Sequence, residues 1–168
     1  IGGSIFLGPF DSKEITDATM RTIADSTGVA YTSILLQVLT AVVIILLGIA
    51  MYRAAGHINK VLADIALSMY IVEAILLVVG QVFVFGLVEA AKLYVLNADP
   101  SLLSIGKILL VCREFSGQIA MIPFGIGAFL FYYLLLKAHI LPKWLGLYAL
   151  VTVPLILIFV PFMAFGID

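Results

Sequence analysis

The chain has 168 residues, of which 64% are hydrophobic and 11% charged, and its formal net charge is −1. A soluble domain is nearer half apolar and a quarter charged, and a small domain has too much surface to hide such an apolar excess. The charge excludes the basic field that nucleic-acid binding needs, and the single Cys112 excludes a disulfide framework or a thiolate metal cage. The composition therefore predicts a single transmembrane domain over residues 1–168.

Long apolar segments follow one another along the chain. A membrane-spanning helix needs about 20 apolar residues. Residues 26–52, 115–136 and 144–167 carry no charge, and residues 65–88 carry only Glu73. The sequence predicts an all-α integral membrane helical bundle with five membrane-embedded helices. We expect them over residues 1–10, 28–55, 60–95, 101–139 and 143–166.

Residues 1–10 resemble the end of a longer apolar segment, so we interpret the first helix as truncated rather than as a signal peptide, since no basic region precedes it. The segment from Asp11 to Glu14 reads as a capping box and predicts a short polar helix over 12–25. Further helix boundaries are expected from their capping and turn residues at Gly56, Asn59, Asp99-Pro100 and Leu141-Pro142.

Positive residues in the short loops set the expected orientation. Arg53 with Lys60, and Lys137 with Lys143, place loops 53–60 and 137–143 in the cytoplasm of a cell membrane. The more acidic loops 11–25 and 89–107 are then external. The third and fourth long segments exceed a bilayer about 30 Å thick, so we expect their surplus to project outside as an antiparallel hairpin closed at Asn97–Pro100.

Glu73 is the most distinctive ionisable residue, because it lies near the middle of an apolar segment. A lone carboxyl at that depth is costly, so it should face other helices, near Gln118 to Pro123, and be protonated, paired or hydrated. One interpretation is a proton, ion or ligand site, and the other is a structural bond between two helices. The sequence leaves both open.

A second polar group lies further along, in LLVCREFSGQ. Arg113 and Glu114 are adjacent and therefore point about 100° apart on a helix. Arg113 is a candidate partner for Glu73 or Glu89, and depth favours Glu89. A structural ion pair is the plainer interpretation, and contact with a ligand is the alternative.

Gln118 and the run from Pro123 to Gly127 complete the polar-core candidates. Pro123 removes one helical hydrogen bond and leaves a carbonyl without its donor, while glycines allow close approach of a helix or a ligand. A simple packing kink is the competing interpretation, since Pro and Gly are common in transmembrane helices.

Chemistry beyond binding has little support in the sequence. His57 and His139 fall at the ends of apolar segments without an accompanying carboxylate, so we expect no haem and no metal. We find no nucleophile elbow, zinc-binding helix or phosphate loop. The sequence thus predicts a protein that is not an enzyme and has no catalytic residues and no cofactor.

The chain resembles the bacterial multipass membrane proteins catalogued as domain of unknown function four-three-eight-six. The resemblance rests mainly on residues 109–150, and a further match is Glu73, before which family members often have Arg where this chain has Tyr70. It extends over essentially the whole chain and implies six helices in the full protein. The matching motifs are Arg113-Glu114-Phe115, Pro123 to Gly127, Tyr132-Tyr133-Leu134-Leu135 and Pro142-Lys143-Trp144-Leu145.

Two functions remain open. The buried polar set favours a non-enzymatic protein that binds, senses or moves a small or lipid-like ligand within the bundle, among membrane lipids. The small extramembrane mass is equally typical of a structural or accessory subunit that associates with partner membrane subunits in a larger complex.

Overall fold

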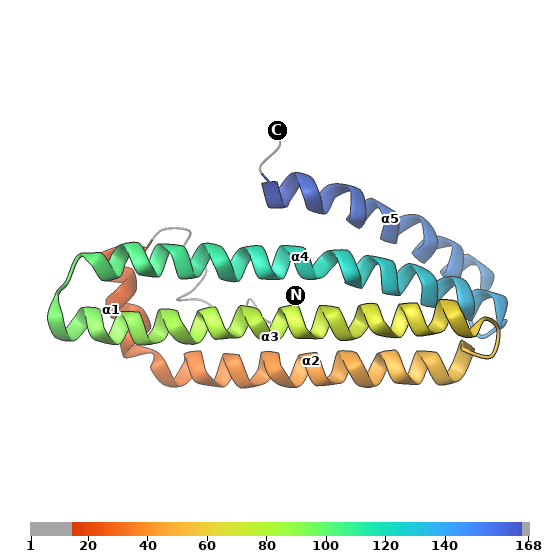
Figure 1. Ribbon diagram of the computed structural model, residues 1–168, viewed down its shortest axis with the longest axis horizontal. Coiled ribbons are helices and arrows are strands. Elements are labelled where there is room, and N and C mark those ends of the chain that lie inside the picture. Colours follow the sequence, from red (N-terminus) through yellow and green to blue (C-terminus); the bar gives the residue numbers. More distant parts are fainter. Residues whose placement is uncertain (1–14, 166–168) are drawn as a thin grey trace. The chain divides into compact units, whose positions relative to one another are not determined.

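The computed structural model describes residues 15–165, with side chains through residue 159. Within this part the chain forms five helices and no strand: α1 (Asp17–Asp25), α2 (Thr27–Ala55), α3 (Lys60–Asn97), α4 (Ser101–Lys137) and α5 (Lys143–Phe165) (Figure 1). The all-α class and the four helices expected from residues 28, 60, 101 and 143 are confirmed. The segment expected over residues 1–10 lies outside the described residues.

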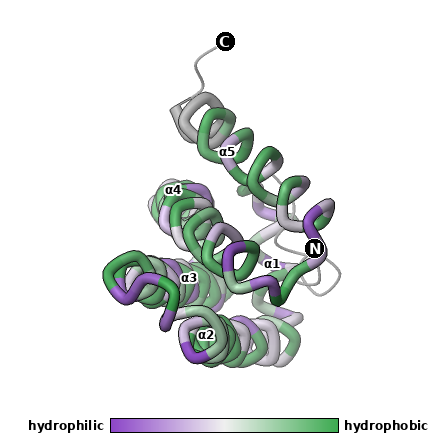
Figure 2. Tube along the Cα trace, turned by 90° about the vertical axis from the view of Figure 1, so that its right-hand side faces the viewer, coloured by the Kyte–Doolittle hydropathy of each residue, from purple (hydrophilic) through white to green (hydrophobic). Residues whose placement is uncertain are grey.

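The three longest helices match the dimensions of a membrane. α2, α3 and α4 have 29, 38 and 37 residues, and each is long and apolar enough to cross a bilayer. Seen nearly along their axes, these helices are largely hydrophobic, with hydrophilic residues at the ends that face the viewer (Figure 2). α5 is also apolar, but the stretch with described side chains, Lys143–Phe159, is shorter.

The expected capping residues begin the long helices. The Asn59 Oδ1 accepts a hydrogen bond from the Leu62 N–H at 3.1 Å, and the Asp99 Oδ1 accepts one from the Ser101 N–H at 2.9 Å. Each bond satisfies an N–H that the first turn of a helix leaves without a backbone partner. The connection between α3 and α4 is residues 98–100, so the turn of the expected helical hairpin is confirmed.

The short polar helix begins later than the sequence indicated. A helix was expected over 12–25, but Thr16 is extended and α1 starts at Asp17. The Thr16 Oγ1 accepts a hydrogen bond from the Thr19 N–H at 3.3 Å, so Thr16 is the N-cap. The helical prediction is therefore wrong at residues 15 and 16, and the capping box at 11–14 lies outside the described residues.

The chain divides into two compact units, which we describe separately. The first unit contains Ile1–Thr40 and Val78–Ser116. α1 supplies Met20 and Ile23 to its core, both fully buried, and Gly106 of α4 allows close approach, since a Cβ there would lie 3.3 Å from the Met20 Cε. The core cluster of this unit consists of Ile15, Met20, Ile23, Ala30, Val84, Leu87, Val88, Ala90, Ala91 and Leu110.

The second unit contains Ala41–Leu77 and Gly117–Asp168. Its core combines small residues with a few large ones, and the rings of Tyr70 and Phe131 meet edge to face with centroids 5.4 Å apart. Small residues let helix backbones approach closely in membrane proteins. The core cluster of this unit consists of Ala55, Ala63, Ala66, Tyr70, Phe131, Leu134 and Leu135.

Candidate functional site

Glu73 lies on the packed face of α3 in the second unit. Its side chain is only 8% exposed, and it follows Ala66 and Tyr70, which are buried as well. The spacing of three to four residues is that of one helix face. The structure therefore places Glu73 among other helices, in agreement with the expectation that its carboxyl does not face outward.

Gly127 of α4 packs on the same face of α3. A Cβ at Gly127 would lie 2.7 Å from the Tyr70 Cδ2 and 3.1 Å from the Ala66 carbonyl oxygen, so the two helices are in close contact here. α3 and α4 run antiparallel through the turn at 98–100. A position three residues after Tyr70 on α3 therefore lies opposite a position three residues before Gly127 on α4. Glu73 is thus at the level of residues 123–124.

Pro123 is buried at this level and lies inside α4. Because proline has no N–H, the carbonyl of Ile119, four residues earlier, lacks its usual helical donor. A donor that approaches from a facing helix or from a ligand can bond to such a carbonyl. The level of Glu73 therefore combines a buried carboxyl with an irregularity in the backbone of α4.

The carboxyl of Glu73 is incompletely bonded. Its Oε2 is buried and has no hydrogen-bond partner among the described residues. Leaving a buried polar atom without a partner costs about 1–3 kcal/mol. A proton neutralises the group most simply, because an ionised carboxyl without a counterion is far more costly in an apolar interior. A donor on a bound molecule would satisfy the oxygen that lacks a hydrogen bond.

The other candidates of α4 are less buried than Glu73. Gln118, in the second unit, is half-buried. It lies five residues before Pro123, so the two point about 140° apart on the helix. In the first unit, Arg113 is half-buried and Glu114 is exposed.

Glu89 has partners that the sequence analysis missed. Its Oε1 lies 2.8 Å from the Lys92 Nζ and accepts a hydrogen bond of 2.7 Å from the Tyr31 hydroxyl. Lys92 also donates to the Tyr31 Oη at 2.6 Å. The expected pairing of Arg113 with Glu89 is therefore wrong, since Lys92 is the partner. The spacing of Glu89 and Lys92 was a signal for this pair, because residues three apart are neighbours on a helix.

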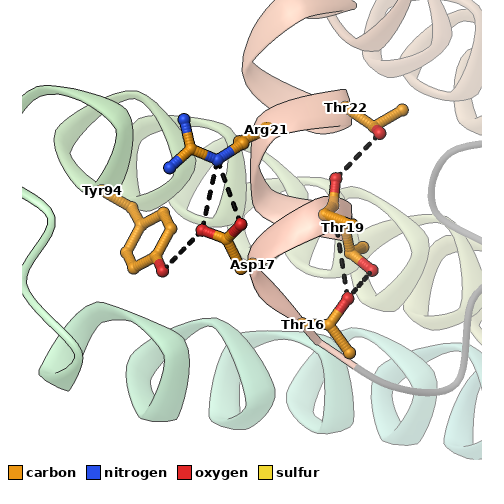
Figure 3. Close-up of polar contacts among 7 residues, drawn as sticks. Thr16, Asp17, Thr19, Arg21, Thr22 and Tyr94 are labelled. Carbon is orange, nitrogen blue, oxygen red and sulfur yellow. Dashed lines mark hydrogen bonds and ion pairs between the residues drawn. The ribbon is translucent and has the colours of Figure 1, made fainter.

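A second polar cluster joins α1 to α3 within the first unit (Figure 3). The Asp17 carboxylate accepts hydrogen bonds from the Arg21 Nε at 3.1 and 3.2 Å and from the Tyr94 hydroxyl at 2.8 Å. The Arg21 hydrogen bond, aided by the Tyr94 hydroxyl, lowers the pKa of Asp17 below its ordinary value. The Tyr94 hydrogen bond links this pair on α1 to α3, so the cluster is an anchor for α1.

Metal-ligating side chains do not gather at Glu73. Across the residues that the structure describes, no group of three His, Cys, Asp or Glu side chains lies close enough to hold a metal ion. A carboxyl such as that of Glu73 can bind or transfer a proton and can form hydrogen bonds to a ligand.

The fold defines an all-α protein with three helices of membrane-spanning length and composition. Residues 1–166 match the family described as Domain of unknown function (DUF4386), and the chain belongs to that family. No curated protein and no solved structure matches the chain.

Proposed function

We propose that the protein is a bacterial multipass protein of the cell membrane. Three helices that are long and apolar enough to cross a bilayer support this proposal. α5 is the fourth membrane helix, and α3 and α4 extend beyond the bilayer on the outer side. Loops 53–60 and 137–143 are cytoplasmic, because they carry positive residues without a balancing excess of acids.

Thiol labelling tests this orientation. Cysteines introduced one at a time at Asn59 and Ala138 should resist an impermeant thiol reagent in intact cells, whereas one at Thr19 should react. Cys112 is replaced first to remove background labelling. Labelling at Asn59 and Ala138 with protection at Thr19 would reverse the orientation.

We further propose that the bundle binds a small or lipid-like molecule at Glu73, and that binding, sensing or moving this molecule is the function. The observation that carries the proposal is the buried Oε2 of Glu73, which has no hydrogen-bond partner among the residues that the structure describes. A ligand with a hydroxyl or amine would supply the missing donor, and the Ile119 carbonyl would accept a further hydrogen bond from it. A purely structural role is less favoured, because a structural carboxyl would be bonded to a neighbouring helix.

Native mass spectrometry of the protein extracted in native lipid tests this role. The wild-type chain should retain a small molecule that Glu73→Gln and Glu73→Leu both lose while remaining folded. Glu89→Gln is the matched control, since that carboxylate on α3 already has partners, and it should retain the ligand. Retention by Glu73→Leu would contradict the proposal. Copurification of a protein of fixed stoichiometry, with no small molecule, would favour the accessory subunit instead.

A further inference from the structure

A cavity of about 370 Å³ lies where α4 ends and α5 begins, within the second unit. It takes no part in the Glu73 site. Its lining contains three basic side chains and two leucines: Leu136, Lys137, His139, Lys143 and Leu147.

The local backbone explains how these side chains come together. α4 ends in a turn in which the Ile140 N–H bonds to the Leu135 carbonyl at 3.1 Å, and His139 takes a positive φ of 56°. This left-handed residue reverses the chain direction, and Pro142 precedes the start of α5. Gly146 then contacts Leu136, since a Cβ there would lie 2.7 Å from the Leu136 Cδ1. The last turn of α4 and the first turn of α5 are thereby held together around the cavity.

The charge of the cavity lining is entirely basic. Lys137, His139 and Lys143 are exposed, and residues 115–167 contain no Asp or Glu that could neutralise them from α5 or from this half of α4. The Lys137 Nζ lies 5.0 Å from the centroid of the Tyr133 ring, which orients the side chain without removing its charge. Such a lining is complementary to a phosphate group.

The surroundings of the cavity are apolar and aromatic. Leu136 and Leu147 form part of its wall, Trp144 is 73% exposed and Tyr148 is 68% exposed. Exposed Trp and Tyr side chains are enriched where protein meets the headgroup region of a bilayer. An inorganic phosphate ion uses only the basic groups, whereas a phospholipid uses the basic groups and the apolar wall together.

We propose that this cavity binds the phosphate headgroup of an anionic membrane phospholipid, with Leu136 and Leu147 against the start of an acyl chain. Lys137 and Lys143 pair with the phosphate, and His139 donates a hydrogen bond to it. Basic pockets between membrane helices on the cytoplasmic side bind anionic headgroups in this way. The inference rests on the proposed membrane embedding and is independent of a ligand at Glu73.

Native mass spectrometry in detergent tests the proposal by titrating the full chain with two lipids of identical acyl chains. Phosphatidylglycerol should bind more tightly than phosphatidylcholine. The double variant Lys137→Gln/Lys143→Gln should weaken phosphatidylglycerol binding roughly thirty-fold, if each lysine near the surface contributes as such residues usually do. The matched control is Arg53→Gln/Lys60→Gln, which removes two cations outside the cavity lining and should leave the preference intact.

Each contrary outcome is distinct. Equal binding of the two lipids, or an unchanged preference in the Lys137→Gln/Lys143→Gln variant, would overturn the site. Displacement of phosphatidylglycerol by millimolar inorganic phosphate would assign it to a free anion. A thermal melt of the double variant confirms that it is folded, and Lys137→Arg/Lys143→Arg should restore binding. Release of the wild-type chain from membranes by alkaline washing would contradict the membrane embedding itself, whatever the lipid titration shows.

Discussion

Two carboxyls of α3 meet opposite environments. Glu89, in the first unit, is partly exposed and bonded to Lys92 and Tyr31. Glu73, in the second unit, is buried, and its Oε2 has no partner among the described residues. Both lie on one continuous helix, so the difference arises from what packs against each position. An acid in an apolar helix is therefore not a candidate binding site by its presence alone. A carboxyl bonded to neighbouring side chains anchors helices, whereas a buried carboxyl with an unbonded oxygen is a candidate site.

The bonded carboxylates of the first unit share a further feature. Glu89 and Asp17 each accept bonds from a basic side chain on their own helix and from a tyrosine on another helix. Such an arrangement satisfies an acid and also joins two helices. Near Glu73, α3 and α4 approach closely at Gly127, and among the described residues no basic side chain bonds to the buried Oε2 of Glu73.

A substitution that separates α3 from α4 at Gly127 should have the largest effect on stability. Gly127→Ala places a Cβ against Tyr70 and the Ala66 carbonyl, so we expect a loss of about 1–3 kcal/mol in unfolding free energy. Gly117→Ala is the matched control, because nothing lies within 4 Å of a Cβ there, and removing a helical glycine should stabilise by up to about 1 kcal/mol. Denaturant unfolding in detergent measures both. Equal effects of the two substitutions would refute the close contact of α3 and α4 at Gly127.

Replacing each carboxyl by leucine should change stability in opposite directions. Glu73→Leu removes an unbonded buried oxygen and should raise the unfolding free energy by about 1 kcal/mol. Glu89→Leu leaves Lys92 and Tyr31 without their acceptor and should lower the melting temperature. Thermal melts of wild type and both variants in the same detergent measure these changes. A lower melting temperature for Glu73→Leu would show that the Glu73 carboxyl is bonded and structural, as the Glu89 carboxyl is.

Removing only the Tyr31 hydroxyl tests how much its hydrogen bonds to Glu89 and Lys92 contribute to stability. Tyr31→Phe loses the hydrogen bonds to Glu89 and Lys92 but keeps the ring, which lies 5.0 Å from the Lys92 Nζ. We expect the melting temperature to fall by roughly 1–3 °C. Tyr148→Phe, at an exposed tyrosine, should be silent. A silent Tyr31→Phe would mean that the Glu89–Lys92 pair does not depend on α2.

The smallest effect should appear at acid pH in the Asp17 cluster. Because Arg21 and Tyr94 lower the pKa of Asp17 below 3.8, its contribution is fully present above that pH. It is lost as the pH falls through the lowered pKa, where the folded state also takes up the proton. Melting temperatures of wild type and Asp17→Asn should therefore differ by a constant amount at neutral pH and converge as the pH falls through the lowered pKa of Asp17. A difference that grows on acidification would contradict this assignment.

Much of the fold was predictable from local signals. The apolar lengths predicted the long helices, and Asn59 and Asp99 marked where two of them begin, because capping depends on residues adjacent in sequence. The start of α1 was not predictable with the same accuracy. The capping box predicted at 11–14 lies outside the described residues, and Thr16, which was not predicted as a cap, accepts the bond from the Thr19 N–H.

The sequence by itself determined that this protein is helical, highly apolar and furnished with a lone acid in the middle of α3, because composition, length and capping are local properties of the chain. Only the tertiary structure decided which acids also bond to a tyrosine on another helix. Tyr31 is 58 residues from Glu89 and Tyr94 is 77 residues from Asp17, so no local pattern indicated these bonds. Burial of Glu73 on α3, the approach of Gly127 to Tyr70 and Ala66, and the basic cavity between α4 and α5 likewise depend on how distant helix faces pack. Such contacts are fixed by side-chain packing and chain reversal in three dimensions.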